Sequence, residues 1–306
     1  MNDYSYKEGK CLQCFKKMMP CYHLWTPENF EIIFRNDSEF RVGMGIMAIA
    51  AKCFPDVKIL TFELMTNHLH IMAACEETRL RMMFEQIRKF LKRMADDAGR
   101  TINWSAFNPG IRVLDSLADA RNVLIYDNRN GFLVNDRYTP FSYPWGSNIC
   151  YFNPDARKRF METSVFSTIK DRRSISHSHI SDELQGLKIL DGCFSPFSFC
   201  DVSAGENLFR DAVHYFYLLS KNIESNKEIA KEIGESISYT EEELYAAIGM
   251  RCMDEYGTAN PAQIPSDAKI MMARIMHYDY NATLKQIQRM LRMDPGVLHS
   301  ILGMHG

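Results

Sequence analysis

The chain has 306 residues, of which 46% are hydrophobic and 24% are charged, and its formal net charge is −2. This composition is typical of a globular protein with one large domain or two ordinary ones, and it excludes a disordered chain. Because the charge is near neutral, overall basicity does not indicate nucleic-acid binding, and any DNA contact has to come from local patches.

The N-terminal residues and the cysteines indicate a cytoplasmic protein. The segment MNDYSYKEGKCLQC is polar and lacks the apolar core of a signal peptide, and no apolar run is long enough to span a bilayer. The nine cysteines are odd in number, and a chain of this length does not need a disulfide scaffold, so we expect reduced thiols.

A zinc-like spacing begins near the N-terminus, with Cys11 and Cys14 followed by Cys21 and His23. The second half, Cys-x-His, is not a standard zinc knuckle. Unligated thiols in a reduced extension are therefore the favoured interpretation, and a zinc site is the alternative.

Residues 1–20 are expected to form an N-terminal extension, and regular elements begin at Cys21. The segment CYHLWT predicts a strand, and a run from Ser38 predicts an amphipathic helix. The segments 57–65 and 68–74 predict two strands joined by a tight turn.

The segment 76–99 predicts a long helix with an apolar stripe, and Gly99 is a suitable stop. A short strand, IRVLDS, follows. Asp115 is then expected to cap a helix, with Gly131 as its stop.

This order of elements predicts an α+β domain over residues 21–150, a ferredoxin-like antiparallel sheet with helices packed on one face. Residues 151–265 are expected to form a connecting and helical region. Residues 266–306 are expected to complete a C-terminal all-helical domain with a helix-turn-helix-like DNA-binding module.

A His-x-His pair lies on the second of the two paired strands. His68 and His70 flank Leu69, so both imidazoles point to the same face of the strand. Two histidines on a rigid strand can hold a divalent metal and leave coordination positions open for a substrate phosphate. The spacing is weak evidence when it stands alone: His177 and His179 share it in a polar, serine-rich context that indicates a solvated loop.

Glu63 is a candidate third ligand. If Thr66 and Asn67 form a two-residue hairpin loop, Glu63 faces His70 across the ladder and Met65 faces His68. A register slip of one residue would move Glu63 to the other face of the sheet, where it would be an ordinary exposed carboxylate.

The segment LMTNHLH (64–70) resembles the Met-Pro-Asn-His-hydrophobic-His strand of the HUH single-tyrosine transposases, in the subgroup associated with repetitive extragenic palindromes. YHLWT (22–26) resembles the first strand of that family. NRNGFL (128–133) and YPWGS (143–147) resemble the end of its catalytic helix and the motif that follows. The resemblance covers about residues 20–150.

The resemblance implies a ferredoxin-like fold that acts on single-stranded or hairpin DNA. His68 and His70 would hold Mg²⁺ or Mn²⁺ against the scissile phosphate, and the metal would act as a Lewis acid. A tyrosine from the facing helix would attack and form a 5′-phosphotyrosine link. Proteins of this family often act as dimers, so a homodimer is possible, and no membrane partner is expected.

The family pattern on this helix is a tyrosine, then asparagine-proline four residues later, then a glycine. Alignment on Gly131 puts Asn122 at the tyrosine position, Tyr126 at the asparagine and Asp127 at the proline. Positions i and i+4 share a helix face, so Tyr126 could still reach the metal if the helix is shifted. Tyr126 is therefore the nucleophile, a residue lining an inactive site or a packed tyrosine, and Arg129 on the same face is a candidate DNA contact.

The C-terminus predicts a helix-turn-helix. A helix over 267–278 is followed by LKQIQRMLR, capped by Asn281 or Thr283, and by VLHSIL with Pro295 at its start. The last helix would enter the major groove, and Lys285, His299 and Ser300 are the candidate DNA contacts. The alternative is a helical hairpin that packs on the first domain or on a second subunit.

Two basic clusters could neutralise phosphates, although such faces are usually only solvated. The first lies on the helix over 76–99 and contains Arg79, Arg81, Arg88, Lys89, Lys92 and Arg93. The second contains Arg157, Lys158, Arg159, Lys170, Arg172 and Arg173. Three tryptophans could stack on bases but are more often core residues: Trp25, Trp104 and Trp145.

The sequence therefore predicts a metal-dependent enzyme that nicks and rejoins single-stranded DNA, with Tyr126 and Asn122 in the site. The alternative is a catalytically inactive DNA-binding or regulatory protein, domesticated on the same fold.

Overall fold

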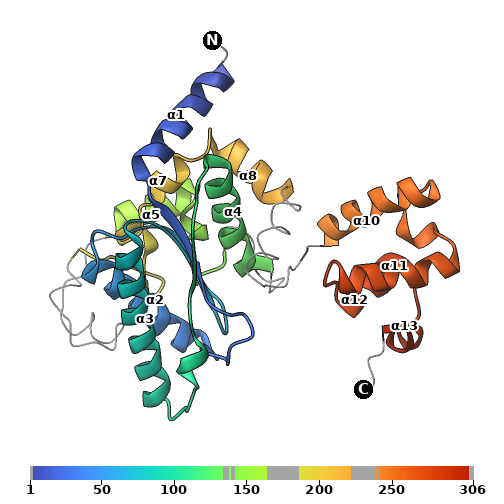
Figure 1. The fold of residues 1–306 in the computed structure, drawn as a ribbon, viewed down its shortest axis with the longest axis horizontal. Coiled ribbons are helices and arrows are strands. Elements are labelled where there is room, and N and C mark those ends of the chain that lie inside the picture. The colour runs from blue at the N-terminus through green and yellow to red at the C-terminus, as the bar shows by residue number, and fades with distance from the viewer. Residues whose placement is uncertain are drawn as a thin grey trace. The chain divides into compact units, whose positions relative to one another are not determined.

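The computed structural model describes residues 3–133, 138, 142–163, 186–221, 239 and 241–302 (Figure 1). The chain forms two compact units, Met1–Ser225 and Asn226–Gly306, and each is described by itself. The pair His177 and His179, and the basic residues Lys170, Arg172 and Arg173, lie outside the described residues.

The first unit is built on a four-stranded antiparallel sheet in the order β2-β3-β1-β4. The strands are β1 (Cys21–Trp25), β2 (Lys58–Leu64), β3 (Leu69–Ala74) and β4 (Gly110–Val113). All six residues of β3 are buried, because this strand is paired on both sides and covered on both faces.

Helices cover both faces of the sheet. One face carries Ile71 and Leu64, and it meets α2 (Asp37–Cys53), whose Gly43 approaches the Leu64 side chain. The other face carries His70 and Glu63, and it meets α4 (Leu117–Leu133). The expectation that helices would pack on one face only is therefore wrong, because α4 lies on the face opposite to α2.

The helix α4 is buried between the sheet and other helices. It packs against α1 (Asp3–Met18) and α8 (Ala212–Lys221), and α3 (Glu77–Asp97) packs against α2 instead. The predicted extension at residues 1–20 is thus largely this helix α1, and its Cys11 and Phe15 are buried. Arg121 of α4 donates to both carboxylate oxygens of Glu8, at 2.6 and 3.1 Å.

Both predicted ends of α4 differ from the observed ones. Ser116, rather than Asp115, lies at its start, and its Oγ accepts a hydrogen bond from the Asp119 backbone N–H at 3.1 Å. Gly131 lies inside the helix, which continues to Leu133. Gly131 therefore does not stop the helix.

The remaining elements of the first unit are short. Among the described residues they are α5 (Pro154–Glu162), α7 (Val202–Glu206), a hairpin of β5 (Ile189–Leu190) and β6 (Cys193–Phe194), and 3₁₀ turns at Trp104–Ala106, Asn148–Cys150 and Pro196–Ser198. In the described part of the chain, no helix has the length and apolar character needed to cross a membrane.

His214 of α8 lies where α8 meets the Glu8–Arg121 pair. Burial lowers its pKa to about 4, and the charges of Arg210 and Arg121 act in the same direction, while Glu8 and Asp211 oppose them. An unfolded chain takes up this proton near pH 6.5, whereas the folded chain does so only near the lowered value.

We therefore expect folding stability to fall as the pH is lowered from about 6.5 towards 4, because the unfolded state binds the extra proton in this window. Urea unfolding at pH 7, 6 and 5 measures the effect. The variant His214→Gln should show a flatter dependence, and an equally steep curve for this variant would contradict the assignment.

The second unit has helices at α10 (Glu241–Tyr256), α11 (Ser266–Tyr278), α12 (Leu284–Leu291) and α13 (Pro295–Leu302), with a 3₁₀ turn at Pro261–Gln263. Thr283, not Asn281, caps α12 and forms a capping box with Gln286. Pro295 begins α13, in agreement with the prediction.

Arg292 links α12 to α13 in the left-handed conformation, with φ 49° and ψ 49°. This conformation costs an L-residue roughly 1 kcal/mol relative to glycine. We expect Arg292→Gly to raise the stability of this unit by about that amount in thermal unfolding. The matched variant Gln288→Gly, at an exposed position in the middle of α12, should lower stability by about 1 kcal/mol. Two changes of the same sign would contradict this account.

Candidate functional site

The face of the sheet towards α4 carries several buried polar side chains, among them His23, Glu63 and His70. Glu63 and His70 are direct partners across the β2–β3 ladder, as the sequence predicted. His68 lies just before β3, and its backbone carbonyl accepts a hydrogen bond from Met65 N at 2.8 Å. The predicted pairing of Met65 with His68 is thus also confirmed, and both histidines lie at one end of β3.

The helix α4 brings Tyr126 onto this face. The Tyr126 ring stands edge-on to the His70 ring, with centroids 5.8 Å apart and an interplanar angle of 75°. Tyr126 is only 2% exposed. Asn122 precedes it by one helical turn and is half-buried. Of these two residues, it is Tyr126 that stands against His70.

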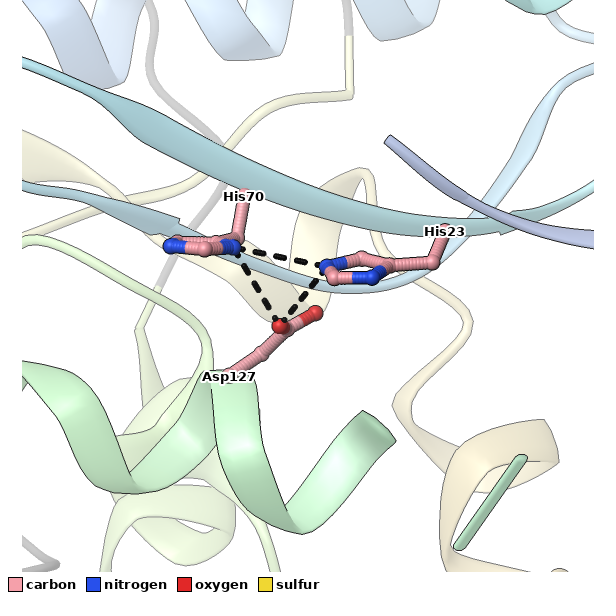
Figure 2. A group of neighbouring side chains, drawn as sticks. All are labelled: His23, His70 and Asp127. Atoms are coloured by element: carbon pink, nitrogen blue, oxygen red, sulfur yellow. Dashed lines mark hydrogen bonds and ion pairs between the residues drawn. The ribbon is translucent and has the colours of Figure 1, made fainter. Parts of the chain in front are cut away.

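A compact triangle of donors lies between the sheet and α4 (Figure 2). His23 Nε2 is 3.1 Å from Asp127 Oδ1, His70 Nδ1 is 3.5 Å from the same oxygen, and the two ring nitrogens are 3.4 Å apart. All three side chains are 0% exposed. Within the described ranges, this is the group of histidine, cysteine and carboxylate side chains whose donor atoms converge closely enough to hold a metal.

This triangle differs from the predicted metal set of His68, His70 and Glu63. Only His70 belongs to both groups. His68 is nearby, with its ring centroid 5.2 Å from that of His70, and its Nδ1 is 2.9 Å from Asn67 Oδ1. It is 8% exposed and is thus less enclosed than His70.

Glu63 is fully buried beside the end of α4. Burial raises the pKa of its carboxyl group well above the usual range, and the charge of Asp127 raises it further, while the backbone N–H of Gly131 opposes both. Glu63 and Asp127 therefore lie close enough for their charges to interact. Asp127 is the carboxylate that lies within ion-pair distance of the His23 and His70 rings.

A hydrogen-bonded network fixes the middle of α4 to the sheet. Asn128 accepts from Thr61 Oγ1, and its Nδ2 donates to Tyr215 Oη at 3.0 Å. Ser147 Oγ is 2.7 Å from Thr61 Oγ1 and accepts from the backbone N–H of Phe62 at 3.1 Å. This network lies one residue from Asp127 and fixes the rotation of the helix that presents Tyr126.

Sequence reasoning missed His23 and Asp127 as partners of His70. As a possible ligand, the sequence pairs His23 with Cys11, Cys14 and Cys21, but those cysteines do not join a metal group with it among the described residues. The available signal was a histidine on a predicted strand of the same sheet. The antiparallel β1–β3 pairing, in which Trp25 faces His70, puts His23 on the same face two positions along.

The predicted DNA contacts of the first unit are not gathered at this site. Arg129 is only 2% exposed, so in this structure it does not present a surface to DNA, and that prediction is not supported. The basic residues of α3 lie on the other side of the sheet, because α3 packs on α2. Arg88, Lys89 and Lys92 line an open hollow of about 750 Å³ that also includes Trp104.

Several of these basic side chains are already paired. Arg88 donates to Glu85 at 2.5 Å, and Arg93 lies 3.8 Å from Asp97. In the second cluster, Arg157 pairs with Glu206 at 2.8 Å and Arg159 with Asp191 at 2.7 Å. Trp104 and Trp145 are buried, and Trp25 is half-buried.

The second unit exposes the three residues proposed to contact DNA: Lys285, His299 and Ser300. Beneath them, α11, α12 and α13 are in mutual contact around Ile287, Leu291, Leu298 and Leu302. Two further apolar residues of this segment, Met293 and Ile301, are only half-buried.

Comparison with known proteins adds no family assignment. A scan against protein-family models finds no match to this sequence, and searches of curated proteins and of solved structures find none either.

Proposed function

We propose that the chain is a metal-dependent enzyme that nicks and rejoins single-stranded or hairpin DNA through a phosphotyrosine link at Tyr126. The observation that carries the proposal is the position of Tyr126, which α4 holds against His70 on the histidine-bearing face of the sheet. The strand order β2-β3-β1-β4, with one helix between β1 and β2 and one between β3 and β4, supports the ferredoxin-like fold that the resemblance implies.

The position of Tyr126 also supports a different reading of the family pattern. If the pattern is counted from the tyrosine instead of the glycine, Asn130 follows Tyr126 by four residues, as the pattern requires. Gly131 then takes the place of the proline. Asn122 is no longer a lost nucleophile in this alignment but a residue one turn away on the same helix.

The proposed chemistry is a transfer of one phosphodiester bond. The Tyr126 oxygen attacks the phosphorus, the bond from phosphorus to the 3′ oxygen breaks, and the proton lost by the tyrosine is balanced by the one the 3′ oxygen gains. Rejoining is the reverse step. A divalent cation held at His70 would supply Lewis-acid stabilisation of the phosphate charge. His68 is more exposed than either His70 or Tyr126, so we infer that DNA approaches the site from the side of His68.

The test is incubation of the full chain with single-stranded hairpin DNA and Mn²⁺, followed by a denaturing gel and peptide mapping. A covalent adduct that maps to Tyr126 and is lost in His68→Ala is the expected result. Hairpin binding without an adduct, over a range of hairpins and with both Mg²⁺ and Mn²⁺, would overturn the proposal.

A second candidate is a non-catalytic DNA-binding or regulatory protein on the same fold. The observation that favours it is the closure of the site, because His70 is 0% and Tyr126 only 2% exposed. In this case, binding would rest on the helix-turn-helix-like unit. Substitution of Lys285 and His299 should then weaken hairpin binding, while His68→Ala and Tyr126→Phe should not.

A further inference from the structure

Asp127 is a buried carboxylate that lacks hydrogen bonds. Its side chain is 0% exposed, and neither carboxylate oxygen accepts a hydrogen bond from the described residues. The nitrogens of His23 and His70 lie near Oδ1 without hydrogen-bond geometry. A buried carboxylate costs several kcal/mol unless a cation lies beside it, either a protonated imidazole of His23 or His70 or a metal ion held between the three side chains.

The distances between the three donor atoms indicate the coordination geometry of that cation. The edges of the triangle measure 3.1, 3.4 and 3.5 Å. In a tetrahedral zinc site with metal–ligand distances of about 2.0–2.1 Å, neighbouring ligand atoms lie about 3.4 Å apart. In an octahedral Mg²⁺ site with similar metal–ligand distances, neighbouring ligands lie about 2.9 Å apart. The triangle therefore has the size of one face of a tetrahedron.

The donor types lead to the same conclusion. Two imidazole nitrogens and one carboxylate oxygen suit zinc and its neighbours in the transition series, whereas Mg²⁺ prefers oxygen ligands throughout. We propose that His23, His70 and Asp127 bind a tetrahedral transition-metal ion, with Zn²⁺ the expected occupant and a fourth position left to a small ligand. This site is distinct from the expected Mg²⁺ or Mn²⁺ set of His68, His70 and Glu63, because it uses Nδ1 of His70 and excludes His68 and Glu63.

The ion would join three elements that are distant in the sequence. His23 lies on β1, His70 on β3 and Asp127 on α4, next to Tyr126 (Figure 2). A metal bound to all three fixes α4 against the sheet immediately beside the tyrosine. Its main expected effect is on stability, since all three ligands are enclosed and binding favours the folded state.

The experiment uses the full chain, stripped of metal by a chelator and then titrated with Zn²⁺ or Co²⁺. We expect one ion per chain by elemental analysis, a rise in the thermal unfolding temperature on adding Zn²⁺, and the visible absorption of tetrahedral Co²⁺. Asp127→Asn and His23→Gln should each lose the ion, and their unfolding temperatures should not respond to Zn²⁺. The matched controls His68→Ala and Glu63→Gln should keep the ion and the response.

Two results would overturn the site. A folded, metal-free chain that takes up neither Zn²⁺ nor Co²⁺ would leave the triangle as an ion-paired group that only orients His70. Loss of the ion in His68→Ala, with retention in Asp127→Asn, would show that the ion binds at His68, His70 and Glu63 instead. Circular dichroism against the metal-free wild type checks that each variant is folded. Because Asp127→Asn and His23→Gln remove different ligands, the test remains decisive if one of the two fails to fold. None of these readouts involves DNA, so a chain that binds zinc but forms no adduct would contradict only the proposed function.

Discussion

The variant Tyr126→Phe is expected to abolish formation of the covalent DNA adduct, with a loss on the order of 10⁴-fold or more, because phenylalanine has no oxygen to attack the phosphorus. Hairpin binding should change little, since the ring that stands against His70 is retained. Loss of the buried hydroxyl should cost about 1 kcal/mol of folding stability. Single-turnover assays on denaturing gels, together with urea unfolding, measure both quantities.

Asn122 provides the matched control for the position of the nucleophile. Asn122→Ala should retain adduct formation, and the double variant Tyr126→Phe with Asn122→Tyr should not recover it, because the new hydroxyl would lie one helical turn away. Recovery in the double variant would show that the family position is the functional one. An adduct on another tyrosine in Tyr126→Phe would remove Tyr126 from the mechanism.

The variant Gly131→Ala is expected to lower the free energy of unfolding by about 3 kcal/mol. A Cβ atom at this position would overlap both the Glu63 Oε1 atom and the Tyr143 ring. Neither neighbour can move easily, because both are buried and the Tyr143 hydroxyl donates to the Leu64 carbonyl at 2.5 Å. Urea unfolding of the full chain measures the loss.

Gly9 is the matched control for this substitution. It lies exposed on α1, and a Cβ atom there would meet nothing within 4 Å. Gly9→Ala should therefore raise stability by roughly 0.5–1 kcal/mol, since alanine favours the helix. A loss in Gly131→Ala no larger than about 0.5 kcal/mol would mean that Glu63 and Tyr143 move aside freely, and would contradict the crowding at this position.

The strands and amphipathic helices could be predicted because their signals are local. The segments 57–65 and 68–74 predicted β2 and β3 to within about one residue of each end, and the apolar stripe through Leu80, Phe84 and Ile87 predicted α3. The turn at Thr66 and Asn67 then determined the pairing of Glu63 with His70. In each case, the residues that decide the structure are close together in the sequence.

The helix α4 was predicted only as far as its local pattern allowed. Gly131 looks like a helix stop in the sequence, but it lies inside α4. Glycine is present there because the buried Glu63 and Tyr143 leave no room for a side chain. The face of the sheet that α4 covers depends on contacts with α1 and α8, which lie far away in the sequence. Local periodicity contains no information about either contact.

The triangle of His23, His70 and Asp127 could be predicted from the sequence only in part. His70 was found because its partner His68 is two residues away, whereas His23 and Asp127 come from other elements of the fold. The β1–β3 register and the rotation of α4 bring them together, and both depend on tertiary packing. Asp127 was considered only as a departure from a family proline, so its carboxylate was not recognised as a ligand.

The helix α4 has almost no solvent face, since residues 123–129 are all buried. Consecutive positions meet different neighbours: Tyr126 meets His70, Asp127 the imidazoles and Asn128 the Thr61 network. A substitution anywhere on this stretch therefore disturbs either the sheet, the donor triangle or a neighbouring helix. In evolutionary terms, this segment should accept very few replacements. A saturation mutagenesis map should show residues 123–129 as a continuous run of positions that tolerate few substitutions, in contrast to the exposed positions of α1 and α10.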